Sequence, residues 1–192
     1  MRTIGKLETV EKEMVDHGFR CLDLSETRWT GKGHFITDLG STVIYSRLEE
    51  RKASGVAVML DRIRAKSLLG YNIISDRILT VRLAAEPRNV TLIHVYAPTT
   101  QAPESEWNQF YSRLQQVVSE SRSQDVVIVS GDFNAKIGEG PPIGKYALRP
   151  RNENGEGLID FATANRMIAA NAITHQHARR KYTLEILRRT PP

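Results

Sequence analysis

The amino-acid sequence predicts a mixed α and β protein in which two β-sheets pack face to face and helices lie outside them. Short β-rich runs alternate along the chain with only two or three helical patterns. The stretch from 41 to 96 holds several β-rich runs and no helical pattern, which argues against a doubly wound parallel sheet. The length of 192 residues is typical of one domain.

The first part of the chain is predicted to form a helix and three strands. A helical face of apolar residues ends at Gly18, which supplies a stop signal. The residues of this face are Leu7, Val10, Met14 and Val15. Apolar runs predict strands at Cys21–Leu24, Thr42–Tyr45 and Gly55–Leu60, and the polar stretch 47–54 is expected to join the last two as a hairpin turn.

Two further strands and the main helix follow. The runs Ile78–Leu83 and Val90–Tyr96 flank the turn residues 86–89. Pro103 opens a long helix whose first turn carries Glu104 and Glu106, where the helix dipole favours negative charge. The predicted core face of this helix is Trp107, Phe110, Tyr111, Leu114, Val117 and Val118.

The last third of the chain is predicted to contain a strand, a loop, a helix and a final strand. Val126–Val129 is a run of four apolar residues, which indicates a strand buried on both faces. Residues 138–155 are rich in Pro and Gly and predict a loop. Leu158, Phe161 and Ala162 indicate a last helix, and a strand is expected at Met167–Ala170.

Composition and charge narrow the classes of function. Lys and Arg number 27 and Asp and Glu 22, and the net charge of +5 permits a nucleic-acid partner. Part of this excess lies in the last quarter, which is equally compatible with a solvated basic tail. No apolar run approaches the ~18 residues of a membrane helix, and no secretory signal is evident. The lack of such a run leads us to expect no membrane partner. Because Cys21 is the one cysteine, no internal disulfide can form, and with no signal evident we expect an intracellular protein.

Two of the predicted strands run into acidic residues. Glu26 follows the strand at 21–24, and Asp132 and Asn134 follow the strand at 126–129. On an extended segment Asp132 and Asn134 point to the same side, so they could meet one water or one metal ion, and Glu26 could join them. Such oxygen ligands suit Mg²⁺ or Mn²⁺ rather than zinc. Taken alone, however, Gly-Asp-x-Asn is also a common turn, and an isolated Glu after a strand is usually a surface residue.

The joint pattern of motifs is more specific than any one of them. The motifs are Leu24–Gly31, Ile74–Ile78, Tyr96–Thr99, Gly131–Gly138, Asn154–Leu158 and Lys181–Thr183. Together they resemble the endonuclease/exonuclease/phosphatase family of metal-dependent phosphodiesterases, and within it the branch that contains craniofacial development protein 2 and the endonuclease domains of LINE-type retrotransposons. The resemblance covers about residues 5 to 183. It implies an α/β (α+β) fold, a four-layered α/β sandwich of two packed mixed β-sheets with outer helices.

The resemblance also implies a role for individual residues. Glu26 is the expected ligand of Mg²⁺ or Mn²⁺. Asp132 is expected to position or deprotonate the attacking water, Asn134 to orient it and the phosphate, and Tyr96 to donate a hydrogen bond to a phosphate oxygen. The resemblance further suggests a set of residues that contact the nucleic acid, namely Arg28, Trp29 and Thr183. On its own, Trp29 fits a position in the core or at its rim.

Parts of the family pattern have no counterpart in this chain. The family's first strand carries an Asn, and its last strands carry a Ser-Asp-His triplet. We therefore expect residues 1–183 to form an incomplete domain that lacks the first strand and the C-terminal strands, followed by a divergent basic tail at 184–192. With about half of the catalytic set absent, weak or lost activity is expected.

Three functional hypotheses follow from the sequence. The first is metal-dependent hydrolysis of phosphodiesters in nucleic acid, with DNA favoured, in an endonuclease-like reaction. The second is a nucleic-acid-binding remnant that does not cleave, and the third is a non-functional retroelement fragment. A DNA substrate favours the nucleus over the cytoplasm. The sequence does not indicate an oligomeric state.

Overall fold

A computed structural model describes residues 5–27, 29–47, 55–138, 146, 150–173 and 175. The chain divides into two compact units, Met1–Asn134 and Ala135–Pro192. The first unit contains both β-sheets and the helices α1 (Lys6–Asp16) and α2 (Glu104–Glu120). The second unit contains α3 (Glu153–Ala164) and the short α4 (Ala170–Ile173). Within the described residues, no helix has the length and apolar character needed to cross a bilayer.

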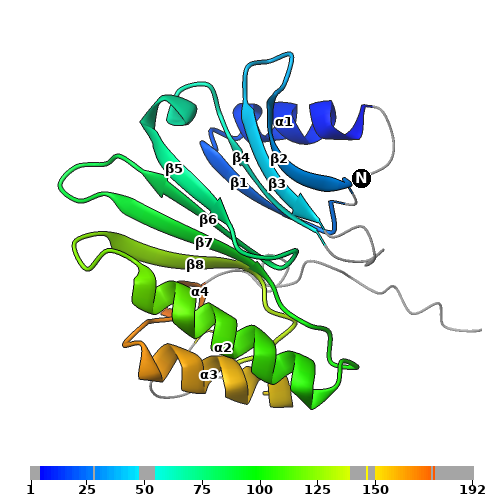
Figure 1. The fold of residues 1–192 in the computed structure, drawn as a ribbon, viewed down its shortest axis with the longest axis vertical. Helices are drawn as coiled ribbons and strands as arrows, with labels where there is room; N and C mark the ends of the chain where they lie inside the picture. The colour runs from blue at the N-terminus through cyan, green and yellow to red at the C-terminus, as the bar shows by residue number, and fades with distance from the viewer. Residues whose placement is uncertain are drawn as a thin grey trace, which may run out of the picture. The chain divides into compact units, whose positions relative to one another are not determined.

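Each sheet of the first unit has four strands (Figure 1). Sheet A is antiparallel throughout and has the order β1-β4-β3-β2. Its strands are β1 (Cys21–Ser25), β2 (Gly31–Ile36), β3 (Thr42–Arg47) and β4 (Val56–Leu60). Sheet B has the order β5-β6-β7-β8, in which β8 is parallel to β7 because α2 forms the crossover between them. Its strands are β5 (Leu68–Ile73), β6 (Ile78–Leu83), β7 (Val90–Tyr96) and β8 (Val126–Asp132), and the short 3-10 helix η1 (Arg64–Ser67) precedes β5.

The main core lies between the two sheets. Successive side chains of a strand point to opposite faces, so one half of β4 faces sheet B. These residues are Val56, Val58 and Leu60, and all are fully buried. They pack in one cluster with residues of sheet B, namely Leu79, Val81, Leu83, Leu92 and Tyr96. This apolar layer supplies most of the favourable free energy of folding.

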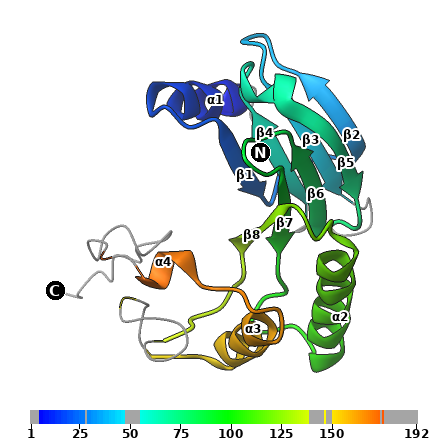
Figure 2. The same ribbon diagram turned by 90° about the vertical axis from the view of Figure 1, so that its left-hand side faces the viewer.

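The outer faces of both sheets are covered by helices. The other half of β4, Ala57 and Met59, packs with Met14 of α1 on the outer side of sheet A (Figure 2). On sheet B, Ile93 and Val95 are fully buried on the face away from sheet A. The buried side of α2, which is formed by Phe110, Leu114 and Val117, covers sheet B (Figure 1). The predicted order of helix, sheet, sheet and helix is therefore confirmed.

Two edge strands have no clear signal in the sequence. β2 begins Gly31-Lys32-Gly33, and β5 contains Gly70 beside an irregularity in its register. Glycine weakens a strand pattern, and each of these strands is half exposed at the outside of its sheet. The sequence does not predict these strands, because an edge strand pairs on one side only and its apolar pattern is therefore weak.

Two predictions in the last third are wrong. The run Val126–Val129 is not buried on both faces, because β8 is the edge strand of sheet B and Val126 and Ile128 are each 45% exposed. No strand forms at Met167–Ala170 either. Met167 instead donates its backbone N–H to Ala162 O in the turn that ends α3, and α4 begins at Ala170.

The predicted last helix is confirmed, and it begins inside the predicted loop. Asn152 caps α3, since its side chain accepts a hydrogen bond from the backbone N–H of Gly155 at 2.9 Å. The same side-chain oxygen accepts from Lys136 N at 2.7 Å. A Cβ at Gly155 would lie 1.9 Å from Lys136 O, so the chain segments can meet here only at a glycine. The other parts of the loop at 139–149 lie, except for Tyr146, outside the described residues.

Candidate active site

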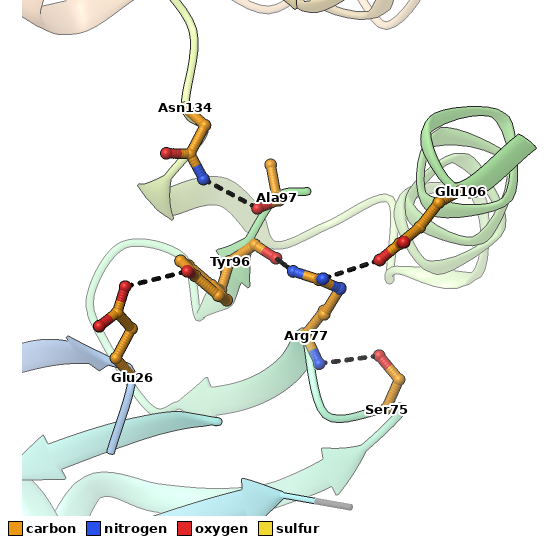
Figure 3. A network of polar contacts seen from close by, with 7 residues as sticks. All are labelled: Glu26, Ser75, Arg77, Tyr96, Ala97, Glu106 and Asn134. Atoms are coloured by element: carbon orange, nitrogen blue, oxygen red, sulfur yellow. Dashed lines mark hydrogen bonds and ion pairs between the residues drawn. The ribbon is translucent and has the colours of Figure 1, made fainter. Parts of the chain in front are cut away.

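The predicted site residues of the first unit gather where three strands end. Tyr96 and Asp132 are the last residues of β7 and β8, and they are direct neighbours in the parallel register. Glu26 follows β1 immediately, and its Oε1 accepts a hydrogen bond from the Tyr96 hydroxyl at 3.0 Å (Figure 3). Residues 70 positions apart in the chain thus meet across the two sheets, as the resemblance implies.

The backbone is strained at two of these residues. Glu26 has φ 54 and Asn134 has φ 47, both in the left-handed region. Among the described residues, Arg166 is the one other non-glycine residue with positive φ. Such a conformation costs roughly 1–3 kcal/mol for a residue other than glycine, and it tends to occur at functional sites. The strain at Glu26 is informative because glutamate, unlike asparagine, has no local preference for this region.

Gly131 allows β8 to approach β7 closely in front of the site. Its φ of 132 lies in a region that favours glycine, and an added Cβ would lie 2.0 Å from the carbonyl oxygen of Val95. No flexible side chain could move to relieve this contact, because the neighbouring atom belongs to the backbone of β7. The Gly of the Gly-Asp-Phe-Asn motif is therefore needed to place Asp132 beside Tyr96.

Asp132 and Asn134 do not lie on an extended segment, so that part of the prediction is wrong. The backbone N–H of Asn134 donates to Asp132 Oδ1 at 2.9 Å, which is an Asx turn. The Asn134 side chain donates through Nδ2 to Ala97 O at 2.9 Å, and Ala97 N donates to Asp132 O at 2.8 Å. The motif is thus a turn, as its composition alone suggests, and this turn fixes Asp132 next to the end of β7. Figure 3 shows the contact of Asn134 with Ala97.

Tyr96 remains a hydrogen-bond donor at neutral pH. Burial and the hydrogen bond to Glu26 raise its pKa to about 12, and the negative charges of Glu26 and Asp132 act in the same direction. The side chain is 6% exposed, whereas the carboxylates of Glu26 and Asp132 belong to exposed residues. A neutral phenol beside two accessible carboxylates can donate a hydrogen bond to an anionic oxygen.

Arg77 holds the end of β7 in place. It lies in the sequence motif at 74–78, but the motif alone does not indicate this role. Its guanidinium donates to Tyr96 O at 3.2 Å and to Glu106 Oε1 of α2 at 2.7 Å. The guanidinium carbon also lies 5.3 Å from the centroid of the Tyr96 ring, a cation–π contact. Its own backbone N–H donates to Ser75 Oγ at 3.1 Å (Figure 3). Arg77 therefore connects Tyr96 to the turn before β6 and to the first turn of α2.

The structure describes one of the three residues that are predicted to contact nucleic acid. Trp29 is partly buried and packs edge-on against Phe35 and Tyr45, with ring centroids 5.7 and 5.8 Å apart. This arrangement agrees with a position at the rim of the core. Arg28 and Thr183 lie outside the described residues.

The donor set of the site suits a hard cation with few protein ligands. Glu26, directly after β1, and Asp132, at the end of β8, supply carboxylate oxygens. Across the part of the chain that the structure describes, no group of three or more His, Cys, Asp and Glu side chains could enclose a metal ion. Mg²⁺ commonly binds through one or two carboxylates, waters and substrate phosphate, so the residues present fit Mg²⁺ or Mn²⁺ in that manner.

Comparison with known proteins identifies relatives of this chain in sequence. The sequence is 37% identical over 182 residues to craniofacial development protein 2 of Tragulus javanicus, and equally so to that of Bos taurus. The matches cover 93% of this chain but only 32% and 31% of those proteins, so the chain spans about a third of their length. No protein-family profile matches the sequence.

Solved structures confirm the fold. The endonuclease domain of TRAS1, a telomere-specific non-LTR retrotransposon, superposes with a TM-score of 0.56 at 14% identity, covering 82% of this chain and 64% of that one. The AP endonuclease LMAP from Leishmania major gives 0.58 at 13% identity, with 83% and 61% covered. D. rerio TDP2, in complex with a single-strand DNA product, gives 0.52 at 13% identity, with 85% and 58% covered. The chain therefore has the endonuclease/exonuclease/phosphatase fold and is related in sequence to craniofacial development protein 2.

Proposed function

We propose that this chain hydrolyses phosphodiester bonds of DNA in a reaction that depends on Mg²⁺ or Mn²⁺, as an endonuclease of the nucleus. One observation carries the proposal. Glu26, Tyr96 and Asp132 meet at the ends of three strands, and the backbone is strained at Glu26 and at the neighbouring Asn134. The solved structures with this fold include two endonucleases and a protein bound to a DNA product, which supports nucleic acid as the substrate.

Asp132 is proposed to take the proton of the attacking water. Its carboxylate is exposed, and one oxygen is oriented by the backbone N–H of Asn134 at 2.9 Å. The Asn134 amide, which donates to Ala97 O, prevents the turn from moving away from β7. A general base needs a fixed position within hydrogen-bond reach of the water that it deprotonates.

Tyr96 is proposed to stabilise negative charge on the phosphate. Its hydroxyl donates to Glu26 Oε1 in this structure, and a phosphate oxygen that approaches Glu26 can accept the same proton. Because the pKa of Tyr96 is raised to about 12, the hydroxyl keeps its proton throughout the physiological range. Donors that are already oriented before the reaction stabilise a developing oxyanion with little reorganisation.

Glu26 is the residue proposed to hold the metal ion, with Asp132 close to it. A bound Mg²⁺ supplies positive charge that offsets the phosphate oxygens and favours ionisation of a bound water. The left-handed backbone at Glu26 turns the chain at the end of β1, and the Tyr96 hydroxyl fixes one carboxylate oxygen. The other oxygen stays available on an exposed side chain.

The test is nicking of supercoiled plasmid by gel-filtered protein, with Mg²⁺ and with EDTA. Asp132→Asn keeps an oxygen for the Asn134 N–H and removes the base, so the rate is expected to fall by about 10²–10⁴-fold. Asp38→Asn is the matched control, because Asp38 is an exposed carboxylate in the β2–β3 turn at the opposite end of sheet A. Its rate should equal that of the wild type.

Two outcomes would contradict the proposal. Nicking that is equal in the wild type and Asp132→Asn would show that the site does not carry the reaction. DNA binding without cleavage, with an affinity that falls steeply with salt and is unchanged in Asp132→Asn, would support the nucleic-acid-binding hypothesis instead.

A further inference from the structure

A partly buried polar network lies directly behind the candidate site. It consists of Asp23 on β1, His94 on β7 and Ser130 on β8. These are the same three strands that end at the site. Asp23 precedes Glu26 by three residues, and His94 and Ser130 each precede a site residue, Tyr96 or Asp132, by two. Two of the three, His94 and Ser130, are also direct neighbours in the register of β7 and β8.

The contacts of this network cross from one sheet to the other. His94 is 0% exposed, and its Nε2 lies 3.0 Å from Leu24 O of β1. Its Nδ1 lies 3.4 Å from Asp23 Oδ2, an ion-pair separation rather than a tight hydrogen bond. The hydroxyl of Ser130 donates to the same Asp23 oxygen. The network therefore joins β1 of sheet A to β7 and β8 of sheet B by directional contacts.

The proton positions of His94 follow from its partners. The carbonyl oxygen of Leu24 can only accept, so Nε2 carries a hydrogen and donates it. The other ring nitrogen, Nδ1, faces the carboxylate of Asp23. Among the described residues, Asp23 is the charged side chain within ion-pair distance of His94.

The electrostatics of Asp23 agree with this assignment. Burial raises the pKa of Asp23, but the neighbouring His94 ring and the hydrogen bond from Ser130 outweigh it, so the pKa lies below its ordinary value. An isolated charge in this position would be strongly disfavoured, whereas a paired one is tolerated. Asp23 Oδ1 and His94 Nδ1 are buried without a hydrogen-bond partner among the described residues.

We propose that Asp23, His94 and Ser130 act as positioning residues that fix the relative placement of the three strand ends carrying Glu26, Tyr96 and Asp132. β1 and β8 are edge strands of different sheets, so no ladder of backbone hydrogen bonds relates them. Apolar packing between sheets is non-directional and does not by itself define such a placement. The part of this proposal that concerns activity rests on the proposed function, and the part that concerns the placement of the strand ends does not.

The first experiment tests the contact of His94 with β1 by ¹⁵N NMR of the wild-type chain. Because the Leu24 carbonyl oxygen can only accept, we expect a proton on Nε2 of His94, with its signal shifted by this hydrogen bond. A ring that carries its one proton on Nδ1 would overturn the proposal.

The second experiment separates positioning from general stability. Asp125→Asn is the matched control, because Asp125 is also a buried carboxylate that accepts from a cation, Arg82, and from a hydroxyl, Thr91. It lies at the opposite end of β7 and β8, since Thr91 precedes His94 by three residues and Asp125 precedes β8. Asp23→Asn should shift the backbone amide signals of the site residues, whereas Asp125→Asn should leave them in place. Equal or absent shifts in the two variants would overturn the proposal.

In the nicking assay, kcat is the quantity that a purely structural role of the network would leave unchanged. Asp23→Asn is expected to lower kcat by about 10–100-fold with little change in KM, because the reacting groups are misplaced but the substrate still binds. Ser130→Ala, which removes one hydroxyl, should have a smaller effect of the same kind and guards against misfolding of the first variant. Equal kcat values in Asp23→Asn, Asp125→Asn and the wild type would overturn the proposal. If the wild type does not nick DNA, the proposed function fails. The NMR results alone then test whether the network positions the strand ends.

Discussion

The carboxylates near the two ends of β7 are held by different sets of partners. At its start, Asp125 accepts hydrogen bonds from both Nε and Nη2 of Arg82 and from the Thr91 hydroxyl, at 2.6, 3.1 and 2.8 Å. Near its end, Asp23 faces His94 at 3.4 Å, and one buried oxygen of Asp23 has no hydrogen-bond partner among the described residues. The backbone just beyond this end is left-handed at Glu26 and Asn134.

This difference indicates that strained backbone and unsatisfied polar groups occur at the site end of β7 and not at the Asp125 end. The Asp125 end has well-satisfied polar groups, as expected of a region that only has to be stable. The site end combines left-handed backbone, incompletely satisfied buried groups and exposed carboxylates. Such features lower stability and are retained where the geometry serves a reaction or a ligand. The comparison predicts that substitutions at the two ends affect different properties.

The largest effect is expected at Gly131. Gly131→Ala would place a Cβ 2.0 Å from Val95 O, so β8 must separate from β7. We expect a loss of about 3–5 kcal/mol in the free energy of unfolding, measured by urea denaturation. The control is Gly70→Ala in β5, where an added Cβ meets nothing within 4 Å. If both variants were equally stable, the close approach of β7 and β8 would be incorrect.

The next effect concerns acid stability at the start of β7. Hydrogen bonds from Arg82 lower the pKa of Asp125 to about 2, although burial opposes this. A carboxyl group with a lowered pKa stabilises the fold above its unfolded pKa of about 3.9, and that contribution is lost as the pH falls toward its folded pKa. Asp125→Asn should therefore lower the urea midpoint at neutral pH, and the difference from the wild type should shrink as the pH falls from about 4 to about 2. A difference that does not change with pH would contradict the ion pair.

At the site end, Tyr96→Phe is expected to reduce activity more than stability. The ring still packs in the core and beside Arg77, so the lost hydrogen bond to Glu26 should cost about 1 kcal/mol of unfolding free energy. The rate of plasmid nicking should fall by about 100-fold, because the donor to the phosphate is removed. An unchanged rate would show that the hydroxyl serves only to hold Glu26.

The sequence predicts the elements of this fold where a single local signal is strong. The central strand β4 is a continuous apolar run, β6 and β7 are rich in β-branched and apolar residues, and α2 has a clear apolar face after Pro103. The edge strands β2 and β5 escape because glycines interrupt them, and β8 is misassigned as doubly buried because an apolar run does not reveal that its strand lies at an edge.

The membership of the candidate site is a prediction of the resemblance, and its geometry comes from the structure. The resemblance selects Glu26, Tyr96, Asp132 and Asn134, and the structure brings Glu26 to Tyr96 and Asn134 to the end of β7. The left-handed backbone of Asn134 could not be anticipated, because it depends on the contact with Ala97. The network of Asp23, His94 and Ser130 could not be predicted either, since its residues lie on three separate strands and their meeting depends on how the sheets pack.

The smallest effect tests whether strain is specific to the site. Arg166, the third left-handed non-glycine residue, follows the C-cap of α3 in a Schellman motif, because Arg166 N donates to Thr163 O and Met167 N to Ala162 O. Glycine is the usual residue at this position, so Arg166→Gly should raise the free energy of unfolding by about 0.5–1 kcal/mol. Glu26→Gly relieves the same backbone strain but loses the hydrogen bond from Tyr96, which costs about 1 kcal/mol, and removes the proposed metal ligand, so its stability should change little while Mg²⁺-dependent nicking is lost. If Glu26→Gly instead destabilised the protein strongly, the left-handed turn after β1 would be held by the Tyr96 hydrogen bond, and the strain would be structural rather than retained for function.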